Sequence, residues 1–319
     1  MNTDGMCWGE MGVFSGTAHP DLAREIAGHL GLEMGALTAS RFPDGEIEVR
    51  INESVRGVDA FIIQPTCPPV NENLMELLVM TDALCRASAG RITAVVPYYG
   101  YARQDKKAAG REPITARMVA DVMTTVGIDR LVTVDLHSAQ IQGFFGVPVD
   151  HLTAVNELSR YMAAKELDNL VVVSPDAGRV KLAAEYANRL GAPVVIIHKR
   201  RLGPERPEVA HVVGDVEGKA PVVIDDMITT GGTIGRSVKA LLENGAKPEI
   251  YVMATHPVLV GRALENLANP AIQEIVVTNT IPLAPEKRLE RIKVVTIAPL
   301  IADAIRSIHT NASVSRLFQ

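Results

Sequence analysis

The chain has 319 residues, more than a typical single domain, which favours two domains with a substantial buried core. Apolar residues make up 47% and aromatic residues only 4%, as expected where aliphatic side chains fill parallel strands and their covering helices. The formal net charge is −5, and acidic and basic residues are interspersed. This charge pattern argues against a nucleic-acid-binding surface and against a basic membrane-binding face, so small molecules are the expected partners.

The three cysteines, Cys7, Cys67 and Cys85, are widely spaced and include no Cys-x-x-Cys pair. Neither a disulfide framework nor a zinc site is indicated, and a reducing compartment fits best. The sequence begins without a basic segment followed by an apolar stretch, and its apolar runs are too short to span a bilayer. We therefore expect a cytoplasmic protein that does not bind membranes.

Taken in chain order, the sequence alternates helical spacing with short β-branched runs. Leu22, Ile26 and Leu30 share a helical spacing, and so do the apolar residues between 74 and 84. Residues 46–51 alternate polar and apolar side chains, which is typical of a half-exposed edge strand or hairpin. Predicted strands are 58–64, 91–96, 130–135, 170–174, 193–197, 221–226, 249–255, 274–278 and 292–297. Such alternation predicts βαβ units, mainly parallel sheets and an α/β fold.

Polar side chains follow four of the predicted strands, where ligands bind in open α/β sheets. Each cluster alone is more often a helix cap or a solvated loop than a functional site. The clusters are 135–137 (DLH), 174–176 (SPD), 198–201 (HKRR) and 225–226 (DD). Because all four clusters follow the carboxyl ends of predicted strands, they favour a functional site at that side of the sheets.

The stretch 222–233 (VVIDDMITTGGT) carries the sharpest signal. A buried strand leads to Asp225 and Asp226, and then a loop of small residues opens a predicted helix over 234–244. Small residues let the backbone approach an anion, and the free N–H groups of a helix N-terminus bind phosphate. The two carboxylates can accept hydrogen bonds from the hydroxyls of a sugar phosphate. The alternative is a glycine turn with a capping threonine.

This stretch resembles the phosphoribosyl pyrophosphate-binding motif of type I phosphoribosyltransferases. Nearly the whole chain resembles the ribose-phosphate pyrophosphokinase family, and several of the matching blocks are absent from ordinary phosphoribosyltransferases. The blocks are RFPDGEIEVRI at 41–51, PYYGYARQDKK at 97–107, REPITA at 111–116, DLHSAQIQGFF at 135–145, SPDAGRVKLA at 174–183, HKRR at 198–201, THPVL at 255–259 and SVSRLF at 313–318.

The resemblance implies two similar phosphoribosyltransferase-like domains, each a mainly parallel sheet flanked by helices. We place the first at 1–148, with the C-terminal segment 305–319 packing back on it, and the second at 149–304. A C-terminal helix is predicted near 299–310 and is expected to pack against the first domain. No linker marks the boundary. The implied reaction transfers the pyrophosphoryl group of ATP to the 1-hydroxyl of ribose 5-phosphate, giving 5-phosphoribosyl 1-pyrophosphate and AMP for nucleotide biosynthesis.

The same resemblance assigns the binding residues. The ribose 5-phosphate residues are Asp225, Asp226, Thr229, Thr230, Gly231, Gly232 and Thr233. The ATP residues are Phe42, Asp44 and Glu46 of a neighbouring subunit, with Arg103, Gln104 and His137. His137 and Asp176 are the magnesium-associated residues, of which the carboxylate suits a hard cation better.

Lys199 and Arg201 match a catalytic pair on a mobile loop, where cations would stabilise charge on the transferred and leaving oxygens. In isolation the run KRR would be read as a solvated basic turn.

Two departures from the family pattern are Thr229 and Gly146, where family members often have Asp. A regulatory site for phosphate and ADP is implied at Ser54, Arg56, Arg86, Ser313, Ser315 and Phe318. Family members form homohexamers, which is the expected assembly here.

Two alternatives remain. A phosphoribosyltransferase would use the same 225–233 loop but would not explain 41–46 and 101–105 as an ATP site. A catalytically silent associated subunit would share the fold, yet this chain keeps Asp176, Lys199, Arg201, Asp225 and Asp226.

Overall fold

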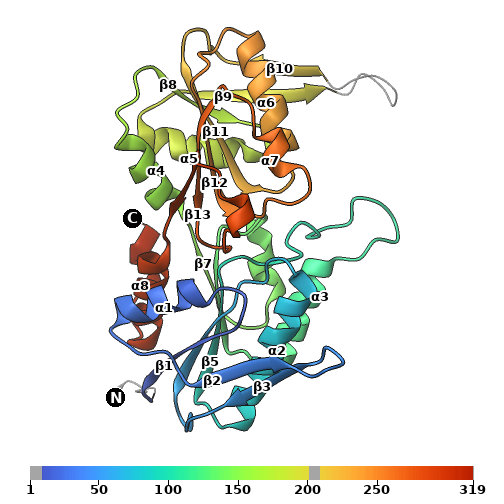
Figure 1. Cartoon of the computed structure of the whole chain (residues 1–319), viewed down its shortest axis with the longest axis vertical. Coiled ribbons are helices and arrows are strands. Elements are labelled where there is room, and N and C mark those ends of the chain that lie inside the picture. The colour runs from blue at the N-terminus through green and yellow to red at the C-terminus, as the bar shows by residue number, and fades with distance from the viewer. Residues whose placement is uncertain (1–8, 201–208, 319) are drawn as a thin grey trace. The chain divides into compact units, whose positions relative to one another are not determined.

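The computed structural model describes residues 9–200 and 209–318, which divide into two compact units. The first unit comprises the residues up to Thr153, together with 280–282 and the chain from Ile297 onward. The second comprises Ala154–Asn279 and Leu283–Thr296. Figure 1 shows the course of the chain through both units.

The first unit is built on a five-stranded sheet in the order β1-β4-β5-β6-β7, with every neighbouring pair parallel. Its strands are β1 (Met11–Ser15), β4 (Asp59–Ile63), β5 (Arg91–Val96), β6 (Arg130–Val134) and β7 (Val149–Leu152). Strands β4 and β5 are buried along their whole length, which explains their continuous runs of apolar residues.

The helical elements of this unit are α1 (Pro20–Leu30), α2 (Val70–Arg86), α3 (Thr115–Val126), η1 (Ala139–Phe144), α8 (Ala298–His309) and η4 (Val314–Phe318). Helix α1 ends at Gly31, whose left-handed conformation suits glycine. The predicted edge strand at 46–51 is confirmed as one arm of an antiparallel hairpin, formed by β2 (Leu37–Arg41) and β3 (Ile47–Ile51).

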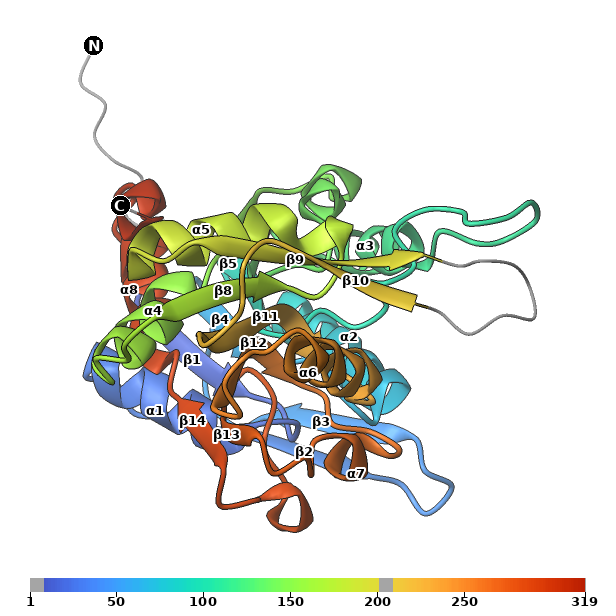
Figure 2. The ribbon, with the colours of Figure 1, turned by 90° about the horizontal axis from the view of Figure 1, so that it is seen from above.

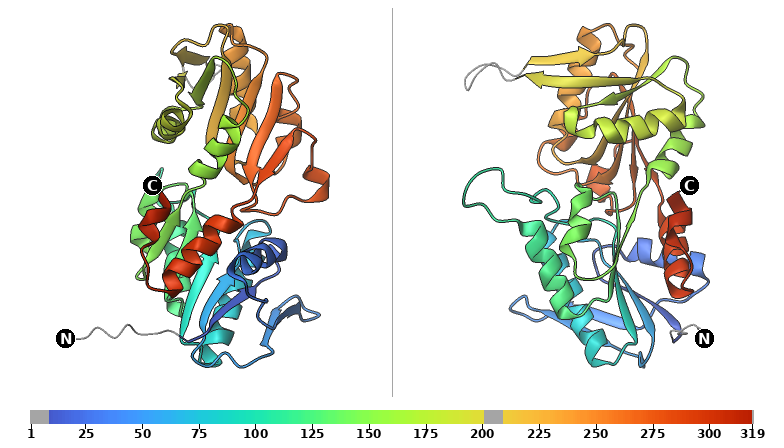
Figure 3. Two further views of the ribbon diagram at one scale, coloured as in Figure 1. Left: turned by 90° about the vertical axis from the view of Figure 1, so that its left-hand side faces the viewer. Right: turned by 180° about the vertical axis from the view of Figure 1, so that it is seen from behind.

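Helix α8 packs against α1, far from it in sequence (Figure 3). A buried ionic network fixes its end. The Arg91 guanidinium donates to Asp59 through Nε (2.7 Å) and Nη2 (2.5 Å), and the Asp59 side chain is fully buried. His309 Nδ1 lies 2.8 Å from the same carboxylate, and Arg91 Nη2 also donates to the Ile308 carbonyl. The C-terminal helix is therefore tied to the N-terminal sheet by charge as well as by apolar packing.

The second unit is built on a seven-stranded sheet in the order β10-β9-β8-β11-β12-β13-β14. Only the edge strand β10 runs antiparallel to its neighbour. The strands are β8 (Leu170–Ser174), β9 (Val194–Arg200), β10 (Val209–Val213), β11 (Ala220–Ile228), β12 (Ile250–Pro257), β13 (Ile272–Thr278) and β14 (Ile292–Val295).

The helical elements of the second unit are α4 (Val155–Ala163), η2 (Ala177–Arg179), α5 (Val180–Leu190), α6 (Gly232–Glu243), α7 (Ala263–Asn266) and η3 (Pro285–Lys287). The crossover through α5 leads from β8 to β9, whereas the one through α6 leads the opposite way, from β11 to β12. Because parallel crossovers are right-handed, the two helices cover opposite faces of the sheet (Figure 2). Strands β8 and β11 flank the switch point, where ligand sites of such sheets lie.

The predicted α/β architecture is confirmed, and each predicted strand is present with shifts of a few residues at its ends. The largest difference is at β9, which continues to Arg200. Strand β11 continues to Ile228 because Met227 and Ile228 keep pairing with β12. Helix α6 begins at Gly232, two residues before the predicted 234. Strands β1, β2, β7 and β10 were not predicted.

The boundaries of the two units also differ in detail from those of the expected domains, which were 1–148 with 305–319 and 149–304. Strand β7 pairs with β6, which places 149–152 in the sheet of the first unit. Residues 280–282 and the whole of α8 belong to that unit as well. Among the described residues, no helix is long and apolar enough to cross a membrane.

Candidate active site

Two adjacent carboxylates in β11 form the centre of the candidate site. Asp225 and Asp226 are 15% and 5% exposed at their side chains, and the Asp226 N–H donates to Oδ1 of Asp225 (2.9 Å). The strand continues beyond them, so they lie within its last four residues and not after its end. Burial, followed by the neighbouring Asp226, raises the pKa of Asp225 to about 8, while the positive charge of Arg179 opposes this rise.

Arg179 is a site residue that sequence reasoning did not single out. It ends η2, which follows strand β8, the parallel neighbour of β11. Its Nε lies 3.2 Å from Oδ1 of Asp225 and its Nη2 lies 2.8 Å from Oδ1 of Asp226. One guanidinium thus joins both acids. The signal available in the sequence was its place shortly after a predicted strand, within the block 174–183 that also contains Asp176.

Asp176 also lies at this edge and begins the turn that carries Arg179. Its Oδ1 accepts from the Gly178 N–H (2.9 Å), and its carbonyl accepts from the Ser174 hydroxyl (2.7 Å). The carboxylate therefore caps η2 as well as being a candidate magnesium ligand. Magnesium is usually held by one or two protein carboxylates together with water and substrate phosphates, so a single Asp fits this role.

The loop after β11 has the geometry of an anion cradle. Residues 225 and 227–234 line a small cavity, and Gly231 adopts the left-handed conformation (φ 71°, ψ −3°) immediately before α6. A side chain at Gly231 would be strained, and its Cβ would lie 3.1 Å from the Ala263 carbonyl oxygen. The predicted phosphate loop, Thr229 to Thr233, thus meets the N-terminus of a 12-residue helix.

Arg236 adds positive charge beside this loop. A Cβ placed at Gly232 would lie 3.4 Å from Nη1 of Arg236, so the guanidinium lies next to the first residue of α6. The side chain is exposed, and it was not predicted as a site residue. The first turn of the helix therefore offers backbone N–H groups and a guanidinium to the same anion.

The expected ATP residues lie in the first unit, on two loops. Phe42, Asp44 and Glu46 form the tip of the β2–β3 hairpin, where Phe42 is 46% exposed and its N–H donates to the Glu46 carbonyl (2.9 Å). Arg103 and Gln104 lie in the long loop between β5 and α3, and both are exposed. The Gln104 carbonyl accepts from the Ala116 N–H (3.2 Å), which ties this part of the loop to α3.

His137 follows β6 and comes two positions after a residue with an unusual backbone conformation. Asp135 has a φ of 39°, in the left-handed region that a non-glycine residue rarely adopts. The Leu136 N–H donates to Nε2 of His151 on the neighbouring strand β7 (2.8 Å), which holds the turn. His137 and Asp176 belong to different units. Among the described residues, no group of three or more His, Cys, Asp or Glu side chains could hold a metal ion.

The structure describes only one residue of the expected catalytic pair. Lys199 belongs to β9, although its side chain is not described, and Arg201 lies outside the described residues. Of the expected effector residues, Ser54 and Arg56 lie beside the end of α2, where the Gly57 N–H donates to the Ser88 carbonyl (2.9 Å). Arg86 there forms an exposed ion pair with Asp82 (2.7 Å).

The remaining effector residues, Ser313, Ser315 and Phe318, lie in or beside η4, which packs against α8 and β7. The side chain of Phe318 is not described. Thr229 lies in the phosphate loop, and Gly146 follows η1. The effect of these two departures from the family pattern stays a prediction.

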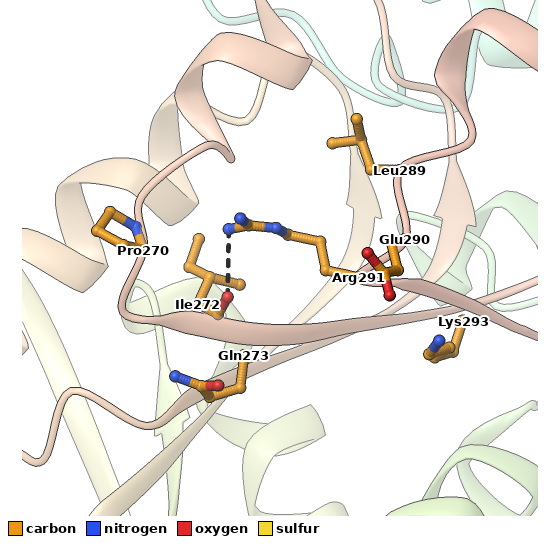
Figure 4. Close-up of a pocket in the computed structure, with 7 residues that line it drawn as sticks. All are labelled: Pro270, Ile272, Gln273, Leu289, Glu290, Arg291 and Lys293. Atoms are coloured by element: carbon orange, nitrogen blue, oxygen red, sulfur yellow. Dashed lines mark hydrogen bonds between the residues drawn. The ribbon is translucent and has the colours of Figure 1, made fainter.

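A second and larger cavity lies at strands β13 and β14, away from all the predicted residues (Figure 4). Its central side chain, Arg291, donates through Nη1 to the backbone carbonyls of Asn269 (2.9 Å) and Ile272 (3.2 Å). Because this guanidinium holds the local backbone, we regard the cavity as structural.

Known proteins resemble the chain over nearly its whole length. Residues 11–127 match the model of the N-terminal domain of ribose phosphate pyrophosphokinase, and residues 201–319 match the phosphoribosyl synthetase-associated domain. A ribose-phosphate pyrophosphokinase from Caldanaerobacter subterraneus subsp. tengcongensis is 54% identical over 307 residues, covering 96% of this chain and 97% of that protein. The chain belongs to the ribose-phosphate pyrophosphokinase family. The Bacillus subtilis member is 52% identical over 306 residues, with 96% of each chain covered.

The fold agrees with this family. The crystal structure of phosphoribosylpyrophosphate synthetase from Mycobacterium smegmatis matches with a TM-score of 0.91 and 49% identity, covering 95% of this chain and 100% of that one. The predicted family, enzyme class and α/β fold are thereby confirmed.

Proposed function

We propose that this member of the family transfers the diphosphoryl group of ATP to the 1-hydroxyl of ribose 5-phosphate, with Mg²⁺ bound. The oxygen of that hydroxyl forms a bond to the β-phosphorus, the bond between the β-phosphorus and the bridging oxygen of AMP breaks, and the hydroxyl proton is released. The observation that carries the proposal lies at the carboxyl ends of the neighbouring strands β8 and β11, where two buried carboxylates lie beside the proposed phosphate loop.

The residues of the second unit have distinct roles in this proposal. Loop 229–233 and the N-terminus of α6 bind the 5-phosphate, and Asp225 and Asp226 accept from ribose hydroxyls. Arg179 holds both carboxylates in place. Asp176 would hold Mg²⁺, which supplies neutralising charge to the phosphates when bound. Lys199 and Arg201 would stabilise charge on the transferred and leaving oxygens.

The first unit would bind ATP. Phe42 offers an exposed aromatic face to adenine at the hairpin tip, with Asp44 and Glu46 as hydrogen-bond acceptors. Arg103 can bind phosphate oxygens, and Gln104 and His137 complete the set. We also propose a homohexamer in which the hairpin serves a neighbouring subunit, phosphate and ADP as effectors, and a cytoplasmic location.

The test is an assay with purified chain, ATP, Mg²⁺ and ribose 5-phosphate, in which AMP and 5-phosphoribosyl 1-pyrophosphate are separated by chromatography. Equimolar products are expected, and Lys199→Ala should lower kcat by about 100-fold or more with ATP affinity unchanged, because its contact forms mainly in the transition state. Folded, assembled protein that forms no AMP would contradict the proposal. Consumption of the pyrophosphate sugar in place of its formation would identify a phosphoribosyltransferase.

A further inference from the structure

The chain after β12 passes directly behind the phosphate loop. The Leu259 N–H donates to the Ile228 carbonyl and the Val260 N–H donates to the Thr229 carbonyl, both at 2.9 Å. Leu259 has a φ of 46°, a left-handed conformation that is unfavourable for leucine. Such a conformation persists only where surrounding contacts hold it, and here those contacts lead the chain across the back of the loop.

The segment that follows packs closely on two glycines of the loop and of α6. A Cβ at Gly231 would lie 3.3 Å from Cβ of Asn266, and one at Gly235 would lie 3.2 Å from the Asn266 carbonyl oxygen. Leu267, the next residue, is fully buried. The absence of side chains at Gly231 and Gly235 therefore lets α7 lie directly behind the loop.

One side chain of this segment bonds to the loop itself. Nδ2 of Asn266 donates to the Thr230 carbonyl at 2.8 Å. A trans peptide directs its C=O and N–H to opposite sides, so fixing the Thr230 carbonyl toward Asn266 fixes the Gly231 N–H away from it. The orientation of a backbone donor in the anion cradle is thus set by a residue 36 positions further along the chain.

We propose that Asn266 is a positioning residue for the 5-phosphate of ribose 5-phosphate. It touches no substrate and acts by holding the Thr230–Gly231 peptide in the orientation that presents its N–H to the anion. This inference rests on the proposed function, because it takes loop 229–233 as the sugar-phosphate site. The contacts with the 5-phosphate are the same in the bound substrate and in the transition state. Loss of Asn266 should therefore raise the KM for ribose 5-phosphate and leave kcat nearly unchanged.

The experiment compares Asn266→Ala and Asn266→Asp with Asn244→Ala. Asn244 is the matched control, since its Nδ2 also donates to a backbone carbonyl at 2.8 Å, that of Ala240, but at the far end of α6. We expect both Asn266 variants to raise the KM and the calorimetric Kd for ribose 5-phosphate by about five- to tenfold, the value of one hydrogen bond. Asn266→Asp keeps the size but replaces the donor with a carboxylate, so it should be no better than alanine.

Three readouts separate a positioning role from a structural one. The KM for ATP should stay the same in all variants, as should the melting temperature within a few degrees of that of Asn244→Ala. Hydrogen exchange of the peptide spanning 229–235 should be faster in Asn266→Ala than in wild type. An unchanged KM for ribose 5-phosphate, or an equal rise in both KM values, would overturn the inference. If wild type itself does not bind ribose 5-phosphate, the proposed function fails first, and the two failures are thus distinguished.

Discussion

Nη2 of Arg179 lies 2.8 Å from Oδ1 of Asp226 in the second unit, with both side chains largely shielded from solvent. The same guanidinium contacts Asp225 through Nε, so one cation pairs with two adjacent acidic side chains. Removing one partner of such a cluster leaves uncompensated buried charge, which is far more costly than losing an exposed pair. In the proposed function, Arg179 thus fixes the position of both acids as hydrogen-bond acceptors for the sugar.

Arg179→Ala should weaken the binding of ribose 5-phosphate. Without the guanidinium the pKa of Asp225 rises further, so the ionised fraction at an assay pH near 8 falls, and a protonated carboxyl is a poorer acceptor for ribose hydroxyls. We expect the KM for ribose 5-phosphate to rise by about tenfold, equivalent to 1.4 kcal/mol, with little change in the KM for ATP. Steady-state kinetics provide the measurement. Arg189→Ala is the control, because Arg189 lies at the other end of α5 and pairs with Glu185. Equal effects of the two substitutions would refute the role of Arg179.

Asp225 should also make the stability of the chain depend on pH. Its folded pKa is raised, to about 8, so between its ordinary value near 4 and pH 8 the folded state retains a proton that the unfolded state has released. The unfolded state then binds fewer protons, and the free energy of unfolding falls as pH rises through this window. Asp225→Asn should reduce this decrease in the free energy of unfolding with pH. Denaturant titrations between pH 5 and pH 8.5 measure it, and parallel curves for the two proteins would contradict the assignment.

The order of strand, loop and helix around 229–233 could be predicted from sequence because all of its information is local. A β-branched run, two acids, two glycines and the start of a helix follow one another within 222–233. The role of Arg179 could be predicted only in part. Its place after a strand was visible in the sequence, but its pairing with Asp225 depends on β8 and β11 being neighbours in the sheet. Nothing in the sequence indicated Asn266, whose bond to Thr230 arises only when the chain returns behind the loop after β12.

The missed strands have a similar explanation. Strand β7 (VDHL) and strand β10 (VAHVV) are short and interrupted by polar residues, and their pairing with longer neighbours is what makes them strands. The position of α8 was predicted from family resemblance, whereas the residues that hold it are separated by 250 positions in the case of His309 and Asp59. Contacts between residues so far apart along the chain produce no periodic pattern in a single sequence.

Asp59→Ala should strongly destabilise the first unit. Asp59 is fully buried and accepts from Arg91, while His309 contacts the same carboxylate, so its loss removes the negative charge that compensates the buried guanidinium. We expect a loss of about 3–5 kcal/mol of unfolding free energy. Asp82→Ala is the control, because its pair with Arg86 is exposed to solvent and should contribute far less to stability. Urea denaturation gives both values, and similar losses in the two variants would contradict the network.

Cys85 should react slowly with alkylating reagents despite its exposure. Partial burial, followed by the negative charges of Asp129 and Asp82, raises the pKa of its thiol, and only the thiolate reacts. The pH at which iodoacetamide alkylation reaches half its maximal rate should therefore lie above that of an unperturbed thiol. Asp82→Asn should move it downward. Mass spectrometry of the peptide containing Cys85 gives the rates, and a midpoint at or below that of a model peptide would refute this environment.

Arg236→Ala should weaken the binding of the 5-phosphate in a manner that depends on salt. The guanidinium lies beside Gly232 at the start of α6, where it adds to the positive end of the helix dipole. Because the side chain is exposed, its contribution should be about 0.5–1 kcal/mol, a two- to fivefold rise in the KM for ribose 5-phosphate. That difference should shrink in 0.5 M salt, since screening weakens exposed charge interactions. Lys239→Ala, one turn further along the same helix, removes the same charge away from the loop and should leave the KM unchanged. A salt-independent effect, or an equal effect of Lys239→Ala, would show that Arg236 does not contact the phosphate.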